Sequence, residues 1–258
     1  MTTAIDLNAD VGEGVGDGVG NDTRLIPLVT SASVAAGAHA GDDQTIELAV
    51  RTAAESGVAI GAHPGHADRD GFGRRPLPID AASIVRLVVP QIERVRSAAE
   101  RHGALLRYVK LHGALYHQVA ADAELAAAFL QAIDDLGNRL PVLGPGGTPL
   151  ADVAAGRGHP FVAEGFADRR YLTDGSLAPR SIAGAVLSAS ADIAAQAVAL
   201  ATDQATIADD GARVAVPCGS ICLHGDRPDA VAVALAVRDA LATAGVTVKA
   251  FVDGTRSV

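Results

Sequence analysis

The chain lacks or has few of the residues that mark several common protein classes. Its 258 residues include no tryptophan and two cysteines, and 21 lysines and arginines stand against 30 aspartates and glutamates. Nucleic acids and anionic membranes are bound through clustered cations, so a net charge of −9 argues against both partners. Two cysteines in a chain this long are not a disulfide framework. We expect Cys218 and Cys222, four apart in an apparent strand, to be buried thiols on one face.

Long apolar segments are also missing. No stretch reaches about 18 uninterrupted apolar residues, and Asp6 lies inside the first apolar segment with no basic leader before it. The sequence therefore predicts neither a membrane span nor a signal peptide, and it favours a cytoplasmic location. What is present is 49% hydrophobic residues, enough for one large core, so we expect residues 1–258 to form a single domain.

Apolar segments of strand length alternate with amphipathic segments of helix length. The predicted strands are residues 4–9, 33–38, 58–62, 105–111, 140–143, 160–164, 219–223 and 246–251. The predicted helices are residues 43–56, 80–102, 122–136, 147–156, 191–203 and 228–244. Asp42, Asp80 and Asp122 are suited to cap three of the helix starts. This rhythm predicts an α/β fold, a (β/α) barrel with seven or eight mostly parallel strands.

Polar residues follow the predicted strands, and histidine is the most regular of them. Four of the eight histidines come after an apolar run and are followed by glycine within two residues: His39, His63, His112 and His224. The loops that leave the carboxyl ends of barrel strands form one face of the barrel. We therefore expect these side chains to meet in one site. The two other histidines considered, His102 and His159, occupy helix-end or loop settings and are expected to be solvated.

Several long motifs resemble those of a known family. These are DLNADVGEG, LVTSASVAAGAHAGD, IGAHPG, GFGRR, VKLHGALY, FADRRY and SICLHGD. They resemble the family of 5-oxoprolinase A subunits, also called the LamB/YcsF family, from about residue 5 to residue 245. The resemblance implies a deformed barrel of the glycoside hydrolase/deacetylase type, and a role in ATP-dependent opening of 5-oxoproline (pyroglutamate) to glutamate with partner subunits B and C. The chain departs from the family pattern at His66, Leu111, His117 and the glycine-rich segment GVGDGVGN, which leaves the shape of the first loop open.

Hydrolysis of a lactam needs activation on both sides of the carbonyl group. A carboxylate or a neutral histidine must take a proton from water, and cations or N–H groups must stabilise the oxyanion. The candidates for the first task are Asp10, Glu13, His39, His63 and His112. The candidates for the second are Lys110 and Arg169. Lys110 is one of only two lysines in the chain, which favours a site role over a solvated one.

The same cluster admits a metal site. Asp10, His39, His63 and His112 form a mixed set of carboxylate and imidazole groups that suits a divalent ion such as Zn²⁺. A metal-free hydrogen-bonding cluster and a purely structural set of histidines are the alternatives, because no HxxxH or HExxH motif is present.

Substrate-binding groups are expected in three places. Asn8 opens the polar segment NADVGEG near the end of the first predicted strand. Gly146 and Gly147 belong to a GPGGT turn, and the backbone N–H groups of this turn are suited to bind an anion. The long polar segment at 164–180 contains Arg169, Tyr171 and Arg180, which are suited to clamp a carboxylate and close over a ring. An ion-pair network that only orders this loop is the alternative.

Nucleotide-binding motifs are weak. The chain contains no GxxxxGK[ST], and the glycine run at 12–20 is interpreted as a loop or lid, since Pro27 stands where a following helix would have to run. ATP is thus implied by the resemblance alone. Two other functions stay open: a stand-alone metal-dependent deacetylase or amidohydrolase, and a non-catalytic binding subunit.

Overall fold

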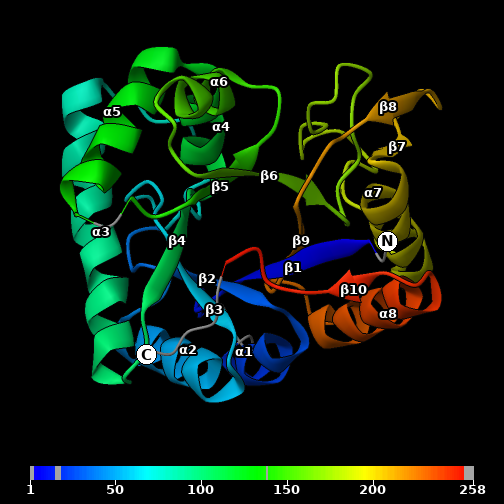
Figure 1. The fold of residues 1–258 in the computed structure, drawn as a ribbon, viewed down its shortest axis with the longest axis horizontal. Coiled ribbons are helices and arrows are strands. Elements are labelled where there is room, and N and C mark those ends of the chain that lie inside the picture. The colour runs from blue at the N-terminus through cyan, green and yellow to red at the C-terminus, as the bar shows by residue number, and fades with distance from the viewer. Residues whose placement is uncertain (1–2, 15–18, 138, 253–258) are drawn as a thin grey trace.

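The computed structural model describes residues 3–14, 19–137 and 139–252, and every structural statement below concerns these residues. Seven parallel strands close into a barrel through the pairing of the first with the last (Figure 1). They are β1 (Ala4–Val11), β2 (Ser31–Ala35), β3 (Ala59–His63), β4 (Leu106–Lys110), β5 (Val142–Pro145), β6 (Phe161–Phe166) and β9 (Ser220–His224). A short strand, β10 (Thr247–Val248), pairs with the start of β1. The predicted (β/α) barrel is confirmed.

Six helices lie where the amphipathic pattern predicts them, outside the barrel (Figure 1). They are α2 (Asp43–Ser56), α3 (Ala81–Arg101), α5 (Ala123–Asp135), α6 (Pro149–Gly156), α7 (Ser190–Asp203) and α8 (Ala230–Thr243). Their apolar faces pack on the strands, and none of the described helices has the length and hydropathy to cross a bilayer. The predicted caps are confirmed, because the carboxylates of Asp42, Asp80 and Asp122 accept backbone N–H groups of the first helical turns.

Five elements of the structure are absent from the prediction. A short helix α1 (Val19–Leu25) continues into a 3-10 turn η2 (Ile26–Leu28), so the expectation that Pro27 excludes a helix there is wrong. Proline sits at the start of the 3-10 turn, where its missing N–H has no partner to lose. The helix α4 (Gly113–Ala121) is apolar on most sides and shows no amphipathic period. The last two elements form a hairpin of β7 (Ala205–Ile207) and β8 (Arg213–Ala215).

A histidine and a cysteine lie elsewhere than predicted. His159 is buried, and its ring nitrogens lie 3.2 Å from an oxygen of Asp134 and 3.0 Å from the carbonyl of Leu140, so the expectation of a solvated ring is wrong. Both cysteines are free and buried, as predicted. Cys218, however, precedes β9 and contacts α7, whereas Cys222 lies inside the barrel, so the two thiols do not share a face.

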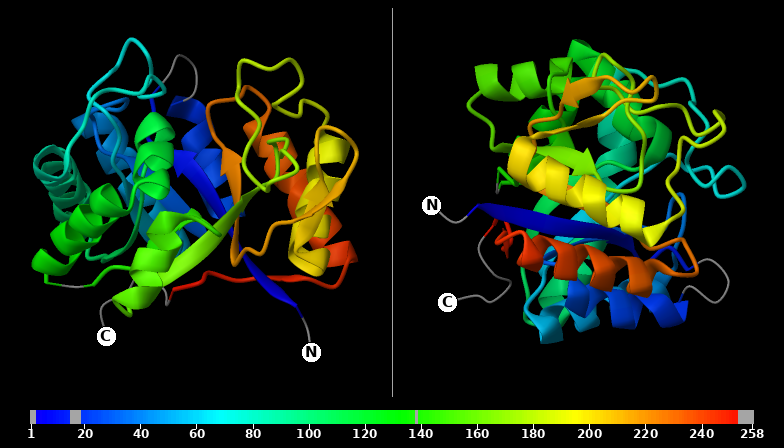
Figure 2. Two further views of the ribbon diagram at one scale, coloured as in Figure 1. Left: turned by 90° about the horizontal axis from the view of Figure 1, so that it is seen from above. Right: turned by 90° about the vertical axis from the view of Figure 1, so that its right-hand side faces the viewer.

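The carboxyl ends of the strands gather the loops that carry polar residues. The loops after β3 and β6 lie at the same end of the barrel (Figure 2, left). Register brings the strand ends into line, since Asp10 pairs with His224 of β9 on one side and with Ser33 of β2 on the other. Side chains that are far apart in sequence therefore converge at this end.

Candidate active site

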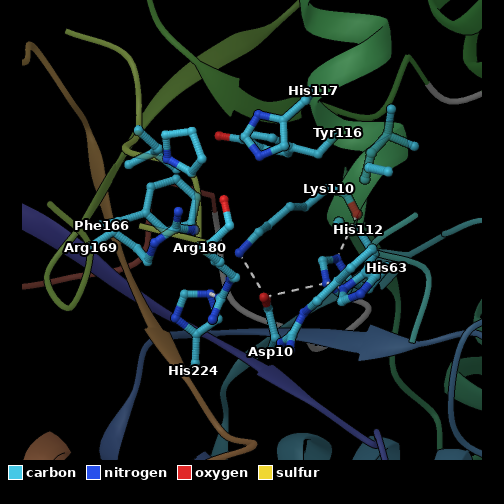
Figure 3. Close-up of a pocket in the computed structure, with 17 residues that line it drawn as sticks. Asp10, His63, Lys110, His112, Tyr116, His117, Phe166, Arg169, Arg180 and His224 are labelled. Carbon is cyan, nitrogen blue, oxygen red and sulfur yellow. Dashed lines mark hydrogen bonds and ion pairs between the residues drawn. The ribbon is translucent and has the colours of Figure 1, made fainter. Parts of the chain in front are cut away.

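A buried lysine forms the floor of the site (Figure 3). Lys110 is the last residue of β4 and its side chain is 2% exposed. Its Nζ lies 2.7 Å from Oδ1 of Asp10 at the end of β1, and 2.8 Å from Oε1 of Glu164 in β6. It also donates to Oδ1 of Asn8 at 3.0 Å and contacts Sγ of Cys222 at 3.2 Å. One ammonium group is thus shared by two buried carboxylates.

The charges of this pair are mutually stabilised. Burial alone raises the pKa of Asp10, but His63 and Lys110 overcome this effect and hold the pKa well below its usual value. Burial alone lowers the pKa of Lys110, but Asp10, Cys222 and Glu164 raise it well above its usual value. Asp10 is therefore ionised and Lys110 charged at neutral pH.

Asn8 supports this lysine from below. The side chain is fully buried, and its Nδ2 donates to Oε1 of Glu164 at 3.0 Å and to Oγ of Ser220 at 2.8 Å. Ser220 donates in turn to the buried carboxylate of Asp6. Asn8 was predicted to bind substrate, but the structure places it beneath Lys110, where it orients the ammonium group.

Histidines from β3 and α4 flank the pair. His63 ends β3, and its Nδ1 donates to the carbonyl oxygen of Lys110 at 2.8 Å. His112 precedes α4, and its Nε2 donates to the carbonyl oxygen of Phe72 at 2.8 Å. The other two ring nitrogens, Nε2 of His63 and Nδ1 of His112, lie 3.0 Å apart, and His63 Nε2 is 3.4 Å from Oδ2 of Asp10.

Glu13 and His39 complete the cluster behind these rings. Oε1 of Glu13 is 3.5 Å from Nδ1 of His112 and 3.7 Å from Nε2 of His39, and the His39 ring stacks on His112 with centroids 3.8 Å apart. Burial and the charge of Asp10 raise the pKa of Glu13. Burial lowers the pKa of His39 to about 3, so this ring is neutral. The structure thus brings all six predicted catalytic residues together.

Two groups of possible metal ligands occur among the described residues, and they differ from the predicted set. One is Glu13, His39, His63 and His112, whose donor atoms lie within 4.8 Å of one another. The other is Asp10, Cys222 and His224. Glu13 stands where the sequence analysis placed Asp10. Oδ1 of Asp10 contacts Nζ of Lys110 at 2.7 Å, and its Oδ2 lies 3.4 Å from Nε2 of His63.

A cavity of about 500 Å³ opens onto the Asp10–Lys110 pair (Figure 3). Arg169, Arg180 and Phe166, the last residue of β6, lie on its wall. Burial and the nearby Arg180 lower the pKa of Arg169 to about 10, and burial lowers that of Arg180 as well. Among the described residues, no carboxylate lies within ion-pair distance of Arg169 or Arg180, although Asp168 and Asp226 act on them from farther away. This part of the wall is therefore cationic, which suits a small anionic ligand.

The loop that carries these arginines is anchored at both ends. Asp168 accepts from Nδ1 of His224 at 2.8 Å, and Nε2 of the same ring lies 3.1 Å from Nη2 of Arg180. Nη2 of Arg169 donates to the carbonyl of Ala178 at 2.6 Å. The loop has no helix between residues 167 and 189, as its polar sequence predicts. His224 thus positions Arg180 at the cavity.

Three predicted substrate-binding residues lie away from this cavity. Gly146 and Gly147 line a neighbouring cavity of about 890 Å³, together with Tyr171. The hydroxyl of Tyr171 accepts the backbone N–H of Phe166 at 2.6 Å, and its ring is buried. Tyr116 borders both cavities. Among the predicted substrate residues, the structure places Arg169 and Arg180 beside Lys110.

Sequence reasoning missed two contributors to the site. Glu164 is the second carboxylate of Lys110, and the carbonyl of Phe72 fixes the His112 ring. Glu164 carried a usable signal, since it stands near the end of a strand like the other site residues. The carbonyl of Phe72 had no such signal, because every residue has a backbone carbonyl group and its contacts do not depend on the residue type.

The motifs that build this barrel end extend over nearly the whole chain. The sequence pattern of the LamB/YcsF family matches residues 5–256. The chain belongs to the LamB/YcsF family. A family relative from Nocardia farcinica (strain IFM 10152), named as the A subunit of 5-oxoprolinase, is 50% identical over 249 residues, which cover 96% of this chain and 99% of the relative. Another, from Symbiobacterium thermophilum and of the same name, is 42% identical over 95% of both chains.

Solved structures agree with this assignment. The lactam utilization protein from Thermus thermophilus superposes with a TM-score of 0.89 at 40% identity, over 96% of this chain and 100% of that one. A family 4 carbohydrate esterase from Streptomyces lividans is 12% identical with a TM-score of 0.51, covering 99% of this chain and 97% of that one. The second likeness concerns the fold alone.

Proposed function

We propose that this chain is the ring-opening component of an ATP-dependent 5-oxoprolinase, which hydrolyses the lactam of 5-oxoproline to glutamate together with subunits B and C. The names of the family relatives and of the lactam utilization protein support this substrate class. The observation that carries the proposal is the ionised Asp10–Lys110 pair at the floor of a cationic cavity. A lactam that bears a carboxylate needs both features.

The cationic wall is suited to hold the substrate carboxylate. Arg169 and Arg180 lie on the same cavity wall, and guanidinium groups bind carboxylates with paired hydrogen bonds. Phe166 offers an apolar surface beside them for the ring carbons. A substrate anchored in this way presents its lactam carbonyl toward the floor of the cavity.

Lys110 and Asp10, at the floor of the cavity, have different roles in this reaction. The Lys110 ammonium is suited to stabilise the negative charge on the activated lactam oxygen when water attacks the carbon that carries it. The Asp10 carboxylate, kept ionised by its neighbours, takes the proton of that water. The C–N bond then breaks, and the ring nitrogen accepts a proton and remains on the product as its amino group.

Activation of the lactam requires ATP and the partner subunits in this proposal. We propose that subunits B and C use ATP to phosphorylate the lactam oxygen, because phosphorylation turns a poor electrophile into a reactive one. Opening of the ring then leaves the phosphoryl group on the new carboxyl group as an acyl phosphate, and hydrolysis of that bond by water releases phosphate and glutamate. A complex that depends on ATP in this way is expected to work in the cytoplasm, where ATP is available.

Reconstitution tests the proposal directly. The purified chain is incubated with 5-oxoproline and ATP, with and without subunits B and C, and glutamate is measured. We expect glutamate only in the complete mixture. Deacetylation of a test amide by the chain alone would support a stand-alone deacetylase instead. Full glutamate production by complexes that carry His63→Ala or Lys110→Ala would show a non-catalytic binding role.

The cationic wall gives a separate prediction. Arg180→Gln in the complex should raise the KM for 5-oxoproline by roughly 10- to 100-fold and change kcat little, because the lost charge-assisted hydrogen bonds are worth about 1.5–3 kcal/mol. Arg170→Gln is the matched control, since Arg170 belongs to the same loop but is exposed and absent from the cavity wall. Equal KM values for the two variants would contradict the assignment.

A further inference from the structure

Two ring nitrogens that both act as hydrogen-bond acceptors face each other in the histidine cluster. The carbonyl oxygens of Lys110 and Phe72 only accept, so Nδ1 of His63 and Nε2 of His112 must carry the ring hydrogens. In neutral rings the remaining nitrogens then present lone pairs. These two nitrogens face each other at 3.0 Å, and a cation between them is what such an arrangement requires.

Two further polar side chains lie against the same place. Oε1 of Glu13 lies 3.5 Å from Nδ1 of His112 and 3.7 Å from Nε2 of His39. His39 is 1% exposed, and among the described residues neither of its ring nitrogens has a hydrogen-bond partner. A buried polar ring without partners is costly and rare in folded proteins. The unpartnered ring therefore marks a binding site.

The spacing and the supports are those of a metal site. Donor atoms bound to zinc at about 2.0–2.1 Å in a tetrahedron are about 3.3 Å apart, and the three separations here run from 3.0 to 3.7 Å. Carbonyl oxygens hold the outer N–H groups of His63 and His112, which is how proteins orient metal-binding histidines. His39 stacks on His112, so it must turn to bind the same ion, and no hydrogen bond from the described part of the chain holds its ring nitrogens.

The second group of possible metal ligands, around Asp10, differs because a protein cation already occupies it. Asp10 and Cys222 belong to a second group of possible ligands, but the ammonium of Lys110 already lies 2.7 Å from the carboxylate and 3.2 Å from the thiol. That group holds a cation of its own. The group around Glu13 also combines a carboxylate with imidazoles, and no described lysine or arginine forms an ion pair with Glu13.

We infer that Glu13, His39, His63 and His112 bind one divalent transition-metal ion, for which Zn²⁺ fits this donor set best. Glu13 replaces Asp10 in the set predicted from the sequence. His63 and His112 also line the cavity, so the ion lies at its wall beside Asp10. Its use in lactam hydrolysis, as a Lewis acid or to activate water, rests on the proposed function, whereas binding of the ion does not.

Metal titration of the full chain tests the inference without substrate, ATP or partners. The chain is stripped with a chelator and titrated with Zn²⁺ by calorimetry, and Co²⁺ is added separately to record the visible spectrum. We expect one equivalent of Zn²⁺, and a tetrahedral Co²⁺ spectrum. Glu13→Gln and His39→Ala should each weaken binding by at least about tenfold.

His102→Ala is the control, because His102 pairs with Glu47 on the helical layer and should leave binding unchanged. Glu13→Gln keeps the size of the side chain, so it serves if His39→Ala does not fold. Absence of stoichiometric binding to the wild-type chain would overturn the inference and leave a proton shared between His63 and His112. Binding that persists in Glu13→Gln would overturn the ligand set. Failure of glutamate production affects neither outcome.

Discussion

Replacement of Lys110 by methionine will lower the free energy of unfolding by about 3–5 kcal/mol, because it leaves buried carboxylates without their cation. Asp10 and Glu164 are both buried, and both depend on the one ammonium group. The same change should lower glutamate production in the complex by at least about 10²-fold, since the oxyanion loses its charged donor. Chemical denaturation measures the first effect, and the reconstituted assay measures the second.

Lys249 provides the matched control. It is the only other lysine of the chain and it is exposed. Lys249→Met should therefore change stability by less than about 0.5 kcal/mol and leave turnover intact. Adding Glu164→Gln to Lys110→Met should recover part of the lost stability, because only one buried carboxylate then lacks a cation. A Lys110→Met variant as stable as the wild type would contradict the shared-ammonium arrangement.

The sequence was sufficient to predict the barrel and the end at which its site lies. Strand-length apolar runs followed by polar residues specify both, because parallel strands of a barrel expose their carboxyl ends on one face. The four histidine segments illustrate this, since His39, His63 and His112 meet in one cluster and His224 lies at the opposite side of the same cavity. The hydrophobic periodicity of a segment and the position of a residue at the end of a strand are local properties, so both can be deduced from the sequence alone.

Side-chain pairing could not be predicted in the same way. Asp10 and Glu13 are three residues apart, and nothing in their spacing says that Asp10 contacts Lys110 while Glu13 lies against His112 and His39. Tyr171 and the GPGGT turn were assigned to the substrate by residue type, yet the tertiary packing places them in the neighbouring cavity. Such roles depend on contacts between strands that are distant in sequence.

Asp10→Asn should lower turnover in the complex by about 10²- to 10⁴-fold while leaving the KM for 5-oxoproline nearly unchanged. The amide cannot take a proton from water, but its oxygen still accepts from Lys110, so the fold is retained. Burial opposes ionisation of Asp10, yet contacts with His63 and Lys110 hold the pKa well below the usual value. The wild-type base is therefore ionised at neutral pH.

Glu164→Gln separates the two roles of these carboxylates. Both contact the same Lys110 ammonium, at 2.7 Å for Asp10 and 2.8 Å for Glu164, but only Asp10 also lines the cavity. If Asp10 acts as the base, Glu164→Gln costs less than about tenfold in turnover and Asp10→Asn costs far more. Equal losses in the two variants would mean that both residues only hold Lys110 in place, and the proton of the attacking water would then have to pass to His63 at the same cavity wall.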